Sequence, residues 1–131
     1  MSTGNLIDST LVRFSVTSRL IESEVVPFGR VVSAGQSDEG CILGGTRPIG
    51  VAVKDRERPE GYSKGDTAGI ARGGLVEVSV SQAVSAGDAV SYNIETGEIG
   101  NLEGEGWQVL PGARFETSSG FMGCAQVYLW G

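Results

Sequence analysis

Histidine is absent from the 131 residues of this chain. Without it there is no Ser-His or Cys-His pair to activate a nucleophile, and the commonest general base and the commonest metal ligand are both missing. Aspartate, glutamate, lysine and tyrosine remain available for catalysis, but they form no spacing typical of a catalytic or metal site. We therefore expect a protein that is not an enzyme and that has no catalytic residues, no bound metal and no cofactor.

Positive charge is also scarce, with 10 Lys and Arg residues against 16 Asp and Glu residues and a net charge of −6. The basic residues are scattered singly, whereas a phosphate-binding surface needs them clustered. Nucleic acid and anionic membrane surfaces are therefore not expected partners. No apolar run approaches the roughly 20 residues of a membrane span. The opening residues "MSTGNLIDST" lack the basic start and apolar core of a signal peptide.

Cysteine occurs twice, as Cys41 and Cys124. Neither belongs to a C-x-x-C pair, so zinc binding and thioredoxin chemistry have no support. The two residues could pair with each other, but an intracellular chain would keep them as buried thiols. We expect two thiols.

Glycine, in contrast, is abundant, with 21 residues and no collagen-like repeat. The usual share is about 7%, and glycine at more than twice that level indicates many tight turns between short strands. Strand-like alternation is clearest where Val76, Val78 and Val80 share one face, after an interruption that Gly73-Gly74 predicts. Thr96-Gly97 is typical of a hairpin tip. No segment after residue 24 sustains a helical period.

This pattern predicts an all-β fold, a small antiparallel β-sandwich or barrel of jelly-roll-like or β-tulip-like form. We divide the chain into an extended N-terminal arm, residues 1–19, and a single β-rich domain, residues 20–131. The stretch Leu11–Val16 alternates like a short strand, although Leu6, Ile7, Leu11 and Phe14 could equally line one face of a helix.

The arm is expected to be loose in the free subunit. Its first ten residues hold three large apolar side chains, too few to offset a backbone ordering cost of about 1–2 kcal/mol per residue. Its apolar row would be a liability if left exposed, so we expect it to pack against a neighbouring chain or add a strand there. The row comprises Leu11, Val12, Phe14 and Val16.

Three loops contain residues typical of binding sites, but we interpret the first as a turn before a strand and the other two as solvated loops. "GGTRPIG" (Gly44–Gly50) lacks the spacing of a phosphate-binding loop and precedes a strand, not a helix. "ETGEIGNLEGEG" carries glutamates among glycines without the spacing of a calcium-binding loop. "KDRERPEGYSKGD" is a solvated loop or a polar contact rim.

The order of several short motifs resembles the tailed-bacteriophage capsid cement proteins, small decoration proteins of the phage head. The likeness runs from about Ser18 to Leu129, and its serial order carries more weight than any single motif. The motifs are "SR" at 18–19, "PFGR" at 27–30, "GVAVKD" at 50–55, "GYSKGD" at 61–66, "GLVEVSV", "VSAGDAV" and "LPGARFETSSGFMGCAQVYL".

The resemblance implies a non-enzymatic protein that binds the outer surface of the mature head and stabilises contacts between major capsid subunits. Its implied partners are the major capsid protein and further copies of itself, a trimer ahead of a dimer, in a virion component made in the host cytoplasm. A carbohydrate-binding β-sandwich and a carboxylate-based hydrolase remain as alternatives. The residues expected to contact the capsid or another subunit are Leu6, Ile7, Leu11, Val12, Phe14, Phe28, Arg30 and Trp107.

Overall fold

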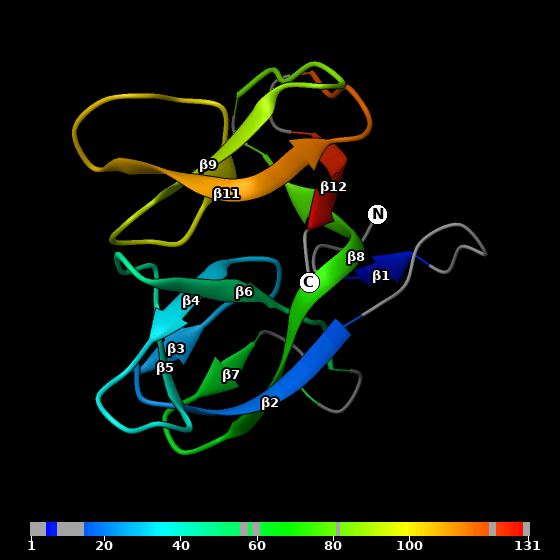
Figure 1. Ribbon diagram of the computed structural model, residues 1–131. Coiled ribbons are helices and arrows are strands. Elements are labelled where there is room, and N and C mark those ends of the chain that lie inside the picture. Colours follow the sequence, from blue (N-terminus) through cyan, green and yellow to red (C-terminus); the bar gives the residue numbers. More distant parts are fainter. Residues whose placement is uncertain are drawn as a thin grey trace.

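The computed structural model describes residues 5–7, 15–55, 58, 61–80, 82–120 and 123–129 (Figure 1). Every regular element in these ranges is a strand, which confirms the predicted all-β class. None of these residues forms a helix long and apolar enough to cross a membrane. The strands are β1 (Asn5–Ile7), β2 (Ser15–Ile21), β3 (Val25–Val26), β4 (Val31–Ala34), β5 (Gly40–Leu43), β6 (Pro48–Ala52), β7 (Tyr62–Ser63), β8 (Thr67–Ser79), β9 (Ala89–Asn93), β10 (Ile99–Gly100), β11 (Trp107–Phe115) and β12 (Cys124–Leu129).

Five strands close into a ring, in the order β2–β5–β4–β6–β8 and back to β2. The pairing of β2 with β5 is parallel, and the other four pairings are antiparallel. Closure leaves none of these strands with a long free edge, which removes the aggregation hazard of an open sheet. This ring is the lower half of the molecule in Figure 1.

The long strand β8 belongs to both halves of the molecule. Residues 67–73 pair with β2 in the ring, and residues 74–79 pair with β12 in a second sheet. That sheet continues as β12–β11–β9–β10 in the upper half of Figure 1. The predicted interruption at Gly73-Gly74 is wrong, because β8 passes through it unbroken. Gly74 adopts a φ of 100°, and the register with β2 shifts just before it, between Ala71 and Gly73.

Two apolar clusters fill the two halves. The ring cluster includes Ile21, Cys41 and Ile70, and the second cluster includes Tyr92, Phe115 and the alternating valines of β8. Val31, Val51 and Ala71 come from ring strands but pack in the second cluster. These three residues make the two halves share one continuous apolar contact, so they are not independent units.

The N-terminal strands lie along successive stretches of β8. β1 pairs with residues 75–77, with Leu6 opposite Val76, and β2 pairs with residues 67–73. The range 1–19 assigned to an arm thus contains β1 and the first part of β2, both paired within the chain. Leu11, Val12 and Phe14 lie outside the described residues.

The two cysteines are free thiols, as expected, and differ in environment. Cys41 lies in the ring cluster with 0% of its surface exposed, and burial raises the pKa of its thiol to about 11. Cys124 is half-buried, and its Sγ lies 3.9 Å from Ser79 Oγ.

We therefore expect a thiol reagent at neutral pH to modify Cys124 quickly and Cys41 only after unfolding, because the thiolate is the reactive species. Mass spectrometry of peptides from native and urea-treated protein measures both sites. The Cys124→Ser variant, which should show no fast reaction, is the control. Equal rates at the two cysteines in the native protein would contradict the buried position of Cys41.

Candidate functional site

The described part of the chain offers no metal centre, since no group of three or more Cys, Asp or Glu side chains comes together there. The most developed polar arrangement is the joint at which the β9–β10 hairpin meets the ring. Here the backbone N–H of Val31 donates to Gly97 O at 2.9 Å, and the N–H of Gly45 donates to Ile94 O at 2.8 Å. These bonds join residues of the two halves directly.

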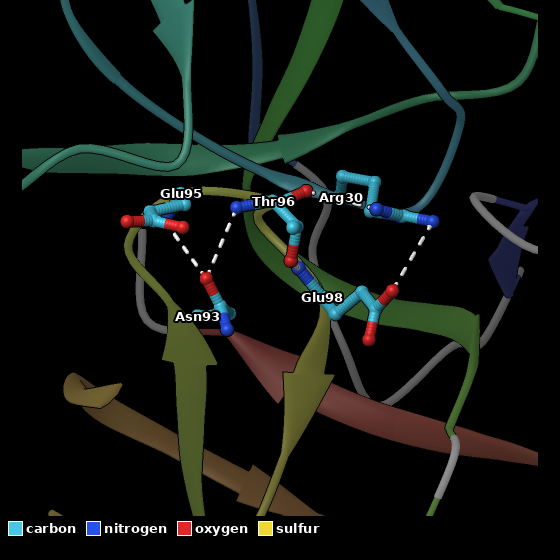
Figure 2. A network of polar contacts seen from close by, with 5 residues as sticks. All are labelled: Arg30, Asn93, Glu95, Thr96 and Glu98. Carbon is cyan, nitrogen blue, oxygen red and sulfur yellow. Dashed lines mark hydrogen bonds and ion pairs between the residues drawn. The ribbon is translucent and has the colours of Figure 1, made fainter. Parts of the chain in front are cut away.

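Arg30 strengthens the joint through its side chain (Figure 2). Its Nη1 donates to Thr96 O at 2.9 Å, and its Nη2 lies 3.7 Å from Glu98 Oε1. Asn93 fixes the same turn from within the hairpin, because its Oδ1 accepts from the backbone N–H groups of Glu95 and Thr96 at 2.8 and 3.1 Å. The short Asn side chain thus fixes the turn conformation in which Thr96 and Glu98 contact Arg30.

A second set of bonds closes the joint beside β11. Tyr92 donates its hydroxyl hydrogen to Gly45 O at 2.8 Å, and Gln108 Nε2 donates to Thr46 O at 2.9 Å and to Tyr92 Oη at 3.0 Å. Burial raises the pKa of Tyr92, so its hydroxyl stays protonated as a donor at neutral pH. The β9–β10 hairpin and β11 are thus held to the ring by two separate sets of hydrogen bonds.

Gly97 is one position at which the joint tolerates little change. Its φ is 71°, and a Cβ placed on it would lie 2.6 Å from Val31 O. The N–H of the same Val31 donates to Gly97 O, so a side chain here would also disturb that hydrogen bond. Gly87 has a similar φ of 91°, but a Cβ there would meet no atom within 4 Å.

We expect Gly97→Ala to lower the free energy of unfolding by roughly 2–3 kcal/mol, about 1–2 from the left-handed backbone and about 1 from the disturbed hydrogen bond. Gly87→Ala should cost only the backbone part. Urea unfolding of both variants measures the difference. Equal losses would mean that the close approach at Gly97 does not matter.

A carboxylate organises the turn between β4 and β5. Glu22, just after β2, accepts from the backbone N–H of Gln36 at 2.8 Å and from the N–H and hydroxyl of Ser37 at 3.2 and 3.0 Å. The backbone bond from Gln36 is the largest cause that holds the pKa of Glu22 below its ordinary value. The charged form of Glu22 is therefore the one that holds the turn.

The stability that Glu22 supplies should be present above its unfolded pKa and lost as the pH falls through its lowered folded pKa. We expect the difference in free energy of unfolding between the parent chain and Glu22→Gln to be largest near neutral pH and to shrink on acidification. Urea unfolding across a pH series measures it. Glu39→Gln, on the same turn and exposed, is the control that removes one charge without removing the hydrogen bonds of Glu22.

Those expected contact residues that the structure describes lie in several separate places. Phe28 is 8% exposed and packs its ring edge-on against Tyr62 with centroids 5.4 Å apart, so it lies inside this chain. Arg30 lies in the joint, and Trp107 begins β11, half-buried and opposite Asn93. Leu6 and Ile7 lie in β1.

Sequence reasoning missed a cleft between the two halves. It has a cavity volume of about 380 Å³ and is lined by Arg47, Pro48, Ile49, Gly50, Arg72, Leu110, Pro111, Ala113 and Leu129. Arg47 and Arg72 are both exposed. The stretch containing Arg47 reads as an ordinary turn, and only the fold brings it near Arg72, so no local signal could have found the pair.

A closed five-stranded ring fused to a second sheet defines an all-β architecture. The family model of the structural cement protein (E217 gp24/Pam3 gp6) matches residues 4–129. The chain belongs to this phage structural cement family, which indicates a non-enzymatic, structural role in the phage particle. No curated protein matches the chain.

Two solved structures share the fold. One is the capsid of Myoviridae phage XM1, with a TM-score of 0.79 and 17% identity over 98% of this chain and 89% of that one. The other is the head fiber gp8.5 N base of bacteriophage phi29, with a TM-score of 0.57 and 15% identity over 90% of this chain and 95% of that one. At these identities the likeness establishes the architecture.

Proposed function

We propose that this chain binds the outer surface of the mature phage head and stabilises contacts between major capsid subunits, without catalysis. The family match over residues 4–129 is the observation that carries the proposal. The joint between the two halves supports it, because a protein that holds neighbouring subunits at a fixed spacing has to resist bending between its own parts.

The proposed physical mechanism is thermodynamic linkage between binding of this protein and expansion of the shell. A protein that binds the expanded shell, and not its precursor, stabilises the expanded state by mass action. Many copies on one shell add modest individual contact energies, so a weak single site is sufficient. The net charge of −6 also keeps the free protein away from the genome before assembly.

The proposed partners are the major capsid protein and further copies of this chain, with a trimer ahead of a dimer. The residues proposed for these contacts are those of the N-terminal segment, Leu6, Ile7, Leu11, Val12 and Phe14, together with Arg30 and Trp107. β1 pairs with its own β8 over three residue pairs. So short a pairing can be given up for a neighbouring chain at the cost of few hydrogen bonds.

We expect purified protein to bind shells of its phage that have expanded and carry no decoration protein, and to raise the temperature at which these shells break. Co-sedimentation and differential scanning calorimetry measure binding and breakage, and electron cryomicroscopy locates the protein. Unexpanded precursor shells are the control and should bind far less.

Density on the inner surface of the shell would contradict the proposed site. Binding without any change in the breakage temperature would contradict the stabilising role. Isolated copies that do not touch one another on the shell would reject the homo-oligomer.

A further inference from the structure

The loop between β10 and β11 projects from the second sheet and carries two glutamates. Residues 101–106, here called the acidic finger, carry the exposed side chains of Leu102, Glu103 and Glu105, and Leu102 is 41% exposed. Gly104 has a φ of 113°, and a Cβ placed on it would meet no atom within 4 Å. The tip therefore stands clear of the rest of the described chain, as the gold loop of Figure 1.

Both ends of the acidic finger are anchored. Ser91 Oγ donates to Leu102 O at 2.7 Å, Asn101 Nδ2 donates to Ala83 O at 3.2 Å, and the N–H of Ile94 donates to Gly106 O at 2.9 Å. The carboxylates of Glu103 and Glu105 make no hydrogen bond or ion pair with any described residue. Because hydrogen bonds hold both of its ends, the acidic finger presents two unpaired carboxylates and an exposed leucine as a preformed binding element.

The cleft between the two halves carries positive charge, opposite to that of the acidic finger. Arg47 and Arg72 are exposed at it, and neither forms an ion pair with a described acid. Pro48, Leu110 and Pro111 supply apolar surface between them. In a chain of net charge −6, two arginines at one apolar cleft favour a ligand with carboxylates beside an apolar side chain.

We propose that the acidic finger of one copy inserts into this two-arginine cleft of the next copy. The two surfaces match in charge and in apolar content. The finger carries two carboxylates and Leu102, and the cleft carries two guanidinium groups and the side chains of Pro48, Leu110 and Pro111. Within one chain the finger ends at Gly106 and the cleft begins at Leu110, about 13 Å further along β11 at roughly 3.3 Å per residue. None of the four charges forms an ion pair with a described residue, so all four are available to bind a second copy.

Such a contact is head-to-tail, since two different surfaces meet, and its repetition closes into a ring or runs on as an open chain. The inference rests on the proposed function, because it supplies the surface by which decoration subunits would touch one another. Its occupant is a second copy of this chain. An acidic segment of the major capsid protein in the cleft is the competing occupant that the experiment has to separate.

Charge reversal in two variants tests the proposal. The finger variant carries Glu103→Lys and Glu105→Lys, and the cleft variant carries Arg47→Glu and Arg72→Glu. Self-association of the full chain is followed by sedimentation velocity and by amide chemical shifts from micromolar to millimolar concentration. We expect each variant alone to associate at least about tenfold more weakly than the parent chain, because like charges then face each other.

Recombining the charges should restore association. An equimolar mixture of the two variants pairs each lysine finger with a glutamate cleft and each parent finger with a parent cleft, so it should associate as the parent does. The chain carrying all four changes should also self-associate. Controls with the same change in net charge are Glu39→Lys with Glu116→Lys, and Lys64→Glu with Arg114→Glu, all on exposed residues outside both surfaces.

Several outcomes would overturn the inference. They are a parent chain whose spectra do not change with concentration, a mixture that associates no better than either variant, and controls that weaken association as much as the test variants. If the cleft variant alone loses shell binding while the finger variant keeps it, the cleft binds the capsid protein instead. Shell binding by the parent chain is scored separately, so failure of this contact and failure of the decoration role are distinguishable.

Discussion

The continuity of β8 is the constraint on which the rest of the structure depends. Its thirteen residues close the ring with β2 and β6 at one end and found the second sheet with β12 at the other. One strand therefore ties the two halves together. The hydrogen bonds from Val31 to Gly97 and from Gly45 to Ile94 add a second connection, between the hairpin and the ring.

Much of this fold can be predicted from the sequence, because strand alternation and turn chemistry act over a few residues. Alternation places Val76, Val78 and Val80 on one face, and the structure buries all three. The Thr96-Gly97 hairpin tip also forms, because the turn chemistry is local and Asn93 is close enough in sequence to hold it. The passage of β8 through Gly73-Gly74 was not predictable in the same way. Pairing with β2 at Gly73 and with β12 at Gly74 carries the strand through this point, and Gly74 permits the φ of 100° that the chain adopts there.

The polar surfaces were harder to predict than the fold. Arg30 was singled out, but its partners Thr96 and Glu98 lie more than sixty residues away and only the docked hairpin brings them close. Phe28 was among the expected contact residues, but it is nearly buried and packs against Tyr62 of the same chain. Arg47 and Arg72 gave no signal at all, since their meeting depends on ring closure between β6 and β8.

The position of β8 in the chain also sets an order of events during synthesis. All its ring partners precede it in the sequence, whereas β9 to β12 follow it. All the ring strands have therefore left the ribosome before β9 to β12 are complete. Until those strands arrive, Val31, Val51 and Ala71 have no apolar cover on their second-cluster side. A chain stalled or cut after β8 would thus expose an apolar patch, the kind of surface that chaperones and proteases recognise.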